Sequence, residues 1–164
     1  MIGRSDARLA YLEAKLKDFE SSTTAELAYA EDHFDIIPEI ENAVVRIIDK
    51  ANPVTSNMQV HVSSSPVSIV ADKAFFQFIV ETLLSQLFHT IQQGIPVSIH
   101  ITKTGERGIV EIQESYLSAV TADARLHTDP SLIVCNQLME DMGGELLHLP
   151  NEKGNYFRLK FLLW

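Results

Sequence analysis

Four polar side chains stand at four-residue spacing within the most apolar segment of the chain. The segment AFFQFIVETLLSQLFHTI covers residues 74–91, and the four side chains are Gln77, Glu81, Ser85 and His89. Residues four apart lie on one face of an α-helix, so these side chains form one polar line along an otherwise apolar helix. Such a line faces either solvent, as the edge of a core helix, or a bound ligand.

Three further residues carry groups that often do chemistry. His61 and His100 lie in segments that alternate like strands, but no spacing supports a metal site, and we expect ordinary surface histidines. Cys135 lies in an apolar helical segment, and we expect a core thiol. The sequence contains no Ser/His/Asp order, P-loop or H-E-x-x-H string, so motifs alone name no reaction.

Length and composition set limits on the function. A chain of 164 residues with 46% hydrophobic residues can bury a real core and reads as one compact unit. Its net charge of −9 opposes phosphate backbones and anionic membranes, so we expect no nucleic-acid binding. No apolar run is long enough to span a bilayer, the N-terminus does not resemble a signal peptide, and the single cysteine suits a reducing compartment; together these features predict a cytoplasmic protein.

The N-terminal segment predicts an amphipathic helix with a narrow apolar stripe. The stripe consists of Leu9, Leu12, Leu16 and Phe19, with charged residues between them. Such a stripe either pairs with its copy in a second chain or packs on its own domain. We take residues 1–30 as this helical segment and residues 31–164 as a separate domain.

The rest of the chain predicts alternating helices and short strands. After a loop around Asp32 and His33, the expected elements are a helix from Phe34 to Asn52, strands near 59–63 and 67–70, the central helix 73–91, a hairpin of 97–102 with 109–114 around Gly105 and Gly108, a helix from Pro130 to Met142, and strands 145–149 and 155–163. This order predicts an α+β fold, a two-layer sandwich with helices on one face of a mixed sheet.

Several strings in this order resemble the ATP-binding catalytic domain of sensor histidine kinases, the Bergerat or GHKL fold. They are Phe34-Asp35 before the first helix; Asp72, Gln77, Leu83 and Thr90 along the central helix; and Gly143-Gly144, Gly154 and Phe157 near the end. The similarity covers about four-fifths of the chain. The N-terminal helix then stands where the family keeps its dimerisation hairpin, but no histidine precedes His33 to accept a phosphoryl group.

The resemblance assigns the polar line of the central helix to the nucleotide. Ser85 stands where the family has the asparagine that binds Mg²⁺, and a serine hydroxyl is shorter than that side chain. Glu81 stands where relatives have a general base or a second asparagine, which leaves it a vestigial role toward water or metal.

The family's adenine and phosphate motifs are altered more strongly. Glu114 replaces the aspartate that accepts the adenine amino group, and Tyr116 and Ser118 replace two glycines beside it. We therefore expect Glu114 to be a solvated carboxylate at a strand end. The glycine-rich phosphate loop is absent between Gly108 and Gly143, where Asp129 and Pro130 start the helix instead.

The sequence thus predicts a degenerate kinase-type domain that acts as an interaction or regulatory module in two-component signalling. The vestigial nucleotide-binding residues are Glu81, Ser85, Glu114, Tyr116, Gly143 and Gly144, of which the two glycines alone indicate a helix stop. We expect no cofactor and no metal site. The alternatives are a working module that binds ATP and Mg²⁺ through divergent ligands, and a phosphotransfer or docking protein for a receiver domain. We also expect the residues between 115 and 129 to pack into the empty cleft, with Tyr116, Leu117 and Leu126 inward.

Replacing Leu12 and Leu16 with glutamate tests the predicted homodimer through residues 6–20. The substitutions would place like charges along the seam and convert the protein to a monomer, as measured by light scattering at tens of micromolar. A wild-type chain that is already monomeric at this concentration would instead show that the stripe packs on its own domain.

Overall fold

A computed structural model describes residues 30–115, 130–151 and 154–164 of the chain. The elements are β1 (Asp32–Asp35), α2 (Ile36–Ala51), β2 (Met58–Val62), β3 (Ser68–Ala71), α3 (Lys73–Gln86), α4 (Phe88–Gln92), β4 (Val97–Thr104), β5 (Arg107–Glu114), α5 (Pro130–Asp141), β6 (Glu145–Asn151) and β7 (Gly154–Leu162). The predicted N-terminal helix with Leu9, Leu12, Leu16 and Phe19, and the segment with Tyr116, Leu117, Leu126 and Asp129, lie outside the described residues.

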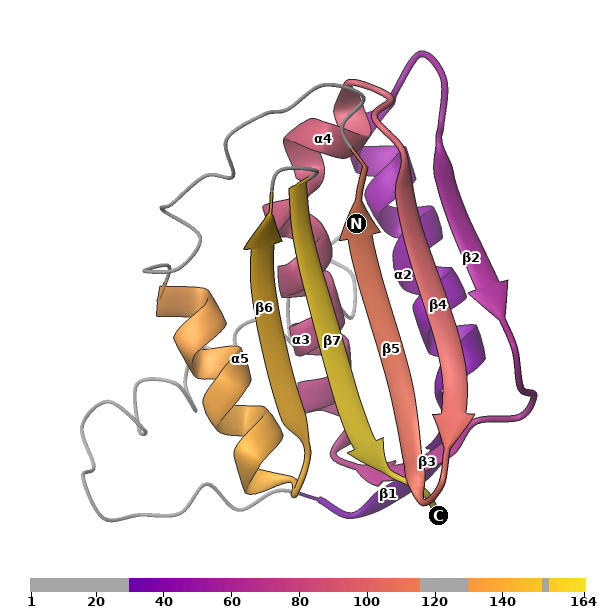
Figure 1. Ribbon diagram of the computed structural model, residues 1–164, viewed down its shortest axis with the longest axis vertical. Coiled ribbons are helices and arrows are strands. Elements are labelled where there is room, and N and C mark those ends of the chain that lie inside the picture. Colours follow the sequence, from indigo (N-terminus) through magenta and orange to yellow (C-terminus); the bar gives the residue numbers. More distant parts are fainter. Residues whose placement is uncertain (1–29, 116–129, 152–153) are drawn as a thin grey trace, which may run out of the picture.

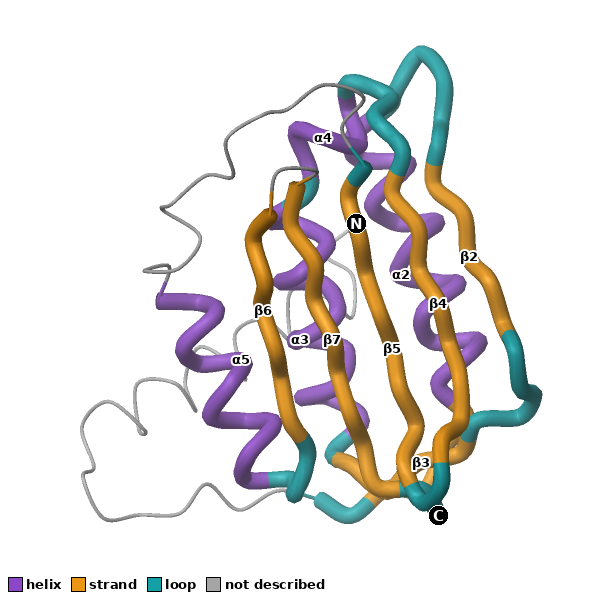
Figure 2. Tube along the Cα trace, in the orientation of Figure 1, coloured by secondary structure: helices purple, strands orange, loops and turns teal. Residues whose placement is uncertain are grey.

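The strands form one five-stranded sheet and one small two-stranded sheet. The large sheet has the order β2-β4-β5-β7-β6, in which β2 and β4 run parallel and the other neighbours antiparallel. The small sheet pairs β1 with β3. Helices α2, α3 and α5 lie on one face of the large sheet, and none of the described helices covers its other face (Figure 1; the same arrangement is coloured by element type in Figure 2). The predicted two-layer α+β fold with a mixed sheet is therefore confirmed.

The core lies between the helical layer and the inward face of the sheet. Along β7 the residues Phe157, Leu159 and Phe161 are at most 2% exposed and alternate with half-buried ones, as the period of a strand requires. From α3, Phe76 and Ile79 are fully buried against them. Phe76 packs on Phe161 at a ring-centroid distance of 5.3 Å. This contact joins the central helix to strand β7 of the sheet.

Aspartates begin the two long helices and tie them to distant strands. Asp35 accepts hydrogen bonds from the amides of Ile37 and Val67. Asp72 accepts from the amide of Phe75 at 3.1 Å and from that of Ala30 at 2.9 Å. A side-chain oxygen at this position satisfies one of the free amides of the first helical turn. Each capping aspartate thus also binds a residue from a distant part of the chain, Val67 or Ala30, beside the start of its helix.

The structure differs from the sequence predictions in three places. Asp32 and His33, predicted in a loop, belong to β1, because their backbones pair with Ala71 and Val70 of β3. The central helix breaks at Leu87, whose amide bonds to the carbonyl of Leu84, and α4 then turns to bury Thr90 and Ile91. Gly108, predicted in the hairpin loop, lies inside β5; a Cβ there would come within about 3 Å of Val67 and Ile69 side chains.

The predicted helix stop at Gly143-Gly144 is confirmed. The amide of Gly143 bonds to the carbonyl of Glu140 and that of Gly144 to the carbonyl of Met139, with Gly143 at φ +75°. This is the Schellman arrangement, which closes a helix through a left-handed residue. A Cβ on Gly144 would lie 2.4 Å from the carbonyl oxygen of Lys160. Gly144 is therefore needed for the close approach of α5 to β7.

Gly144→Ala should lower the free energy of unfolding by about 1–3 kcal/mol, because the methyl group overlaps backbone that cannot move aside easily. Denaturant titration measures the change. Gly105→Asn is the matched control: Gly105 has φ +61° with no atom within 4 Å of an added Cβ, and asparagine tolerates that conformation. Equal losses in the two variants would contradict the packing role of Gly144.

Candidate functional site

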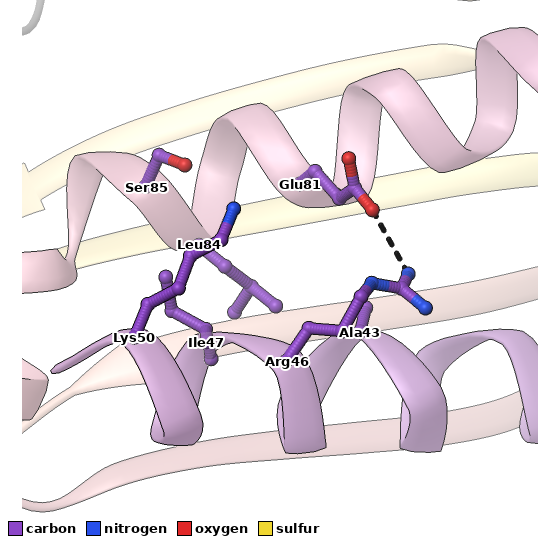
Figure 3. A pocket seen from close by; sticks show the side chains of 7 residues that line it. All are labelled: Ala43, Arg46, Ile47, Lys50, Glu81, Leu84 and Ser85. Carbon is purple, nitrogen blue, oxygen red and sulfur yellow. Dashed lines mark ion pairs between the residues drawn. The ribbon is translucent and has the colours of Figure 1, made fainter. Parts of the chain in front are cut away.

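Glu81 is bound to Arg46 rather than left facing a ligand. Its carboxylate Oε1 lies 2.9 Å from Nη2 of Arg46, across the boundary between α3 and α2 (Figure 3). Both side chains are partly open to solvent, with 43% and 44% of their surface exposed. An ion pair this exposed contributes little to stability, but it places a cation directly on the carboxylate. The arrangement gives Glu81 a defined partner from its own fold.

The pocket beside this ion pair is too small for a nucleotide. It is lined by Ala43, Arg46, Ile47 and Lys50 of α2 and by Glu81, Leu84 and Ser85 of α3 (Figure 3). Its volume of about 20 Å³ corresponds to roughly one water molecule, whereas ligand pockets commonly enclose about 300–1,000 Å³. The structure therefore brings Glu81 and Ser85 together at a notch between two helices.

The rest of the predicted polar line divides between two environments. Gln77 is 9% exposed, and its Nε2 donates to Oε2 of Glu39 on α2 at 2.6 Å. Ser85 and His89 are exposed, and His89 belongs to α4, where its Nε2 lies 2.9 Å from Nε2 of Gln93. At one end, the polar line thus contributes a hydrogen bond between α3 and α2. At the other end, its side chains face solvent.

Glu114 is buried, and the prediction of a solvated strand-end carboxylate is wrong. It is 2% exposed because it continues the inward row of β5, two residues after Ile112. Its Oε1 accepts from Nδ2 of Asn155 on β7 at 3.2 Å, and Oδ1 of Asn155 lies 2.8 Å from Nε2 of His148 on β6. Its Oε2 is buried and has no hydrogen-bond partner among the described residues. A buried carboxylate oxygen without a donor is rare in native proteins.

Sequence reasoning missed Asn155 and His148. Asn155 follows Gly154 at the start of β7, and turn-forming residue types there masked its place in the inward row with Phe157. The ring of His148 stacks on Phe157 at a centroid distance of 4.6 Å. Extending the alternation of β7 back by one step would have placed Asn155 in the core.

The predicted site residues that the structure describes lie at several places in the fold. Glu114 does not line the notch that contains Glu81 and Ser85. Gly143 and Gly144 connect α5 to β6 at one end of the sheet, whereas β5 ends with Glu114 at the other (Figure 1). Tyr116 lies outside the described residues. The two glycines close helix α5, at the end of the sheet opposite Glu114 (Figure 1).

Cys135 is a buried core thiol, as predicted. His61 and His100 are exposed, as predicted, but they lie side by side. Within residues 30–115, 130–151 and 154–164, no three His, Cys, Asp or Glu side chains gather closely enough to hold a metal ion. None of the helices in this part of the chain has the length and apolar content that a bilayer crossing requires.

Solved histidine kinase structures superpose on the chain. The nucleotide-free catalytic domain of histidine kinase ThkA matches with a TM-score of 0.68 at 16% identity, covering 81% of this chain and 96% of that one. ThkA in complex with response regulator TrrA matches with 0.70 at 15% identity, covering 96% and 48%. Full-length ShkA in complex with AMPPNP matches with 0.72 at 15% identity, covering 98% and 37%.

This chain has the fold of a histidine kinase catalytic domain. No protein-family model matches its sequence, and no curated protein is similar to it. The fold is thus shared with these structures at 15–16% sequence identity. A shared fold does not identify a site, so the site is argued from this chain's own residues.

Asn155→Ala should lower the free energy of unfolding by about 1–3 kcal/mol, because it leaves both oxygens of the buried Glu114 without a donor. Denaturant titration at neutral pH measures the loss. Asn136→Ala on the exposed face of α5 is the matched control and should change stability by at most about 0.5 kcal/mol. If both variants are equally stable, the Asn155–Glu114 hydrogen bond does not contribute to the fold.

Proposed function

We propose that this protein is a degenerate histidine-kinase-type domain that binds no nucleotide and acts as an interaction or regulatory module in two-component signalling. Its fold is that of a kinase catalytic domain, whereas the residues that would hold Mg-ATP are replaced or engaged elsewhere. The protein would then bind another signalling protein, and catalysis would belong to that partner.

The Arg46–Glu81 ion pair carries this proposal. A Mg²⁺ site needs oxygen ligands free to approach the ion, usually including one or two carboxylates. Glu81 is the carboxylate on this face of α3, and the guanidinium of Arg46 lies 2.9 Å from its Oε1. A second cation, Lys50, lines the same notch. A metal ion would have to displace Arg46 and remain beside two positive charges, which opposes its binding electrostatically.

The sequence supports the same conclusion for the phosphates. A phosphate cradle uses backbone amides at a helix N-terminus. Helix α5 begins with Pro130, which has no amide hydrogen, and Asp129 precedes it. A carboxylate at that position repels phosphate oxygens.

The partner we propose is a receiver domain or a kinase. ThkA is seen in complex with the response regulator TrrA, and this chain superposes on 48% of that kinase. No histidine precedes His33 within residues 1–164, so a phosphotransfer role would need a histidine-bearing helix outside this sequence. The proposed homodimer depends on residues 6–20 and remains a prediction.

A second candidate function is nucleotide binding through divergent ligands. Oε2 of Glu114 favours it, because this buried acceptor has no donor within the described part of the chain and could take a hydrogen bond from an adenine amino group. ShkA is seen in complex with AMPPNP. ATP and Mg²⁺ would be the cofactors of this candidate, whereas the first proposal has none.

Thermal denaturation with 5 mM Mg-ATP decides between these functions. A ligand at ten times its Kd stabilises the native state by about 1.4 kcal/mol, which raises Tm by several degrees in a domain of this size. We expect a shift below about 1 °C for the wild-type chain. A shift of several degrees that Glu114→Gln abolishes and Ser98→Ala, on the open sheet face, retains would establish the nucleotide-binding function instead.

A further inference from the structure

The open face of the sheet holds two histidines in direct contact. His61 on β2 and His100 on β4 are partners in the parallel register of these strands. Their rings stack at a centroid distance of 4.7 Å with an angle of 18° between the planes. Both are exposed, because they alternate with inward residues such as Ile99 and Ile101. The pair therefore presents imidazole nitrogens to solvent from two rigid strands.

A polar groove surrounds the pair. It has a volume of about 330 Å³ and is lined by Asn57, Gln59, His61, Ser98, His100 and Ser115, with Pro96 and Val97 at its end. Oε1 of Gln59 lies 3.3 Å from Nε2 of His61. Two imidazoles and one amide oxygen thus line one groove, which also admits water.

We propose that His61 and His100 bind one divalent transition-metal ion of the zinc, nickel or copper class, with Gln59 as an oxygen donor. Imidazole nitrogen is the ligand that these ions favour. Two atoms bound to one tetrahedral Zn²⁺ at about 2.0–2.1 Å lie roughly 3.3 Å apart, so the ion would replace the hydrogen bond between Gln59 Oε1 and His61 Nε2, which are 3.3 Å apart. The two imidazole rings are stacked, so the ring of His100 would have to rotate out of the stack to direct a nitrogen at the same ion, and water from the groove would complete the coordination.

The surrounding charges favour a cation at this position. Glu111 on β5 is the register partner of His100 on the same face, and Tyr156 donates a hydrogen bond to its Oε2. Arg158 on β7 is the next residue in this row, one strand farther from the histidines. The carboxylate therefore lies between the metal position and the nearest arginine of the row. The site is on the sheet face opposite the helices, so it does not depend on the proposed loss of nucleotide binding.

Calorimetric titration of the tag-free, EDTA-treated chain with NiCl₂ and ZnCl₂ tests the proposal. We expect saturable binding of one ion per chain. His61→Ala and His100→Ala should each weaken it at least tenfold, and the double variant little further, because either substitution already destroys the chelate. Gln59→Ala should weaken it a few-fold. His89→Ala, an exposed histidine on α4 outside the groove, is the matched control and should bind like wild type.

Paramagnetic resonance of the Cu²⁺-loaded chain gives an independent measurement. Hyperfine structure from two imidazole nitrogens is expected in the wild type and from at most one in either single variant, provided that circular dichroism shows each variant folded. The proposal is overturned by absence of saturable binding below 1 mM, by equal affinity in the two single variants and wild type, or by an equal loss in His89→Ala.

Discussion

Burial of α3 against the sheet is the constraint on which the other features depend. Phe76, Ile79 and Leu83 are fully buried on its inner side, and α2 and α5 pack along its flanks. Burying these side chains stabilises the fold by about 1.5–3 kcal/mol each. Polar side chains can then lie only on the outer side of α3, and part of that side packs against α2. That is why Gln77 bonds to Glu39 and Glu81 to Arg46.

The two candidate carboxylates illustrate opposite environments. Glu81 is partly solvated and neutralised by Arg46, which a surface position permits at little energetic cost. Glu114 is buried with one hydrogen bond from Asn155 and one oxygen without a donor, an arrangement that costs about 1–3 kcal/mol unless a donor arrives. The same fold therefore pairs one of these residues with a cation at the surface and buries the other with a single side-chain donor among the described residues.

The sequence was sufficient for most of the secondary structure because its apolar periodicity is strong. Helix α2 shows buried Ile40, Val44 and Ile47 at helical spacing, and β7 shows strict alternation. Glycine and proline marked the ends of α5 through Pro130 and Gly143. The short strand β1 was not predicted because it forms by pairing with β3, which lies more than thirty residues away in the sequence. Local patterns carry no information on such pairing.

By itself the sequence determined the α+β class, the composition of the core and the absence of the glycines of a phosphate loop, since these follow from residue type and order. Only the tertiary structure decided the partners of the polar groups. The residues around Arg46 in the sequence did not indicate a partner for its side chain. The packing of α2 against α3 places it against Glu81. Asn155 and Glu114 lie 41 residues apart and meet because β5 and β7 are neighbours. His61 and His100 meet because β2 and β4 pair in parallel. Hydrogen bonds and ion pairs depend on distances of a few ångströms, which are set by how elements distant in sequence pack together.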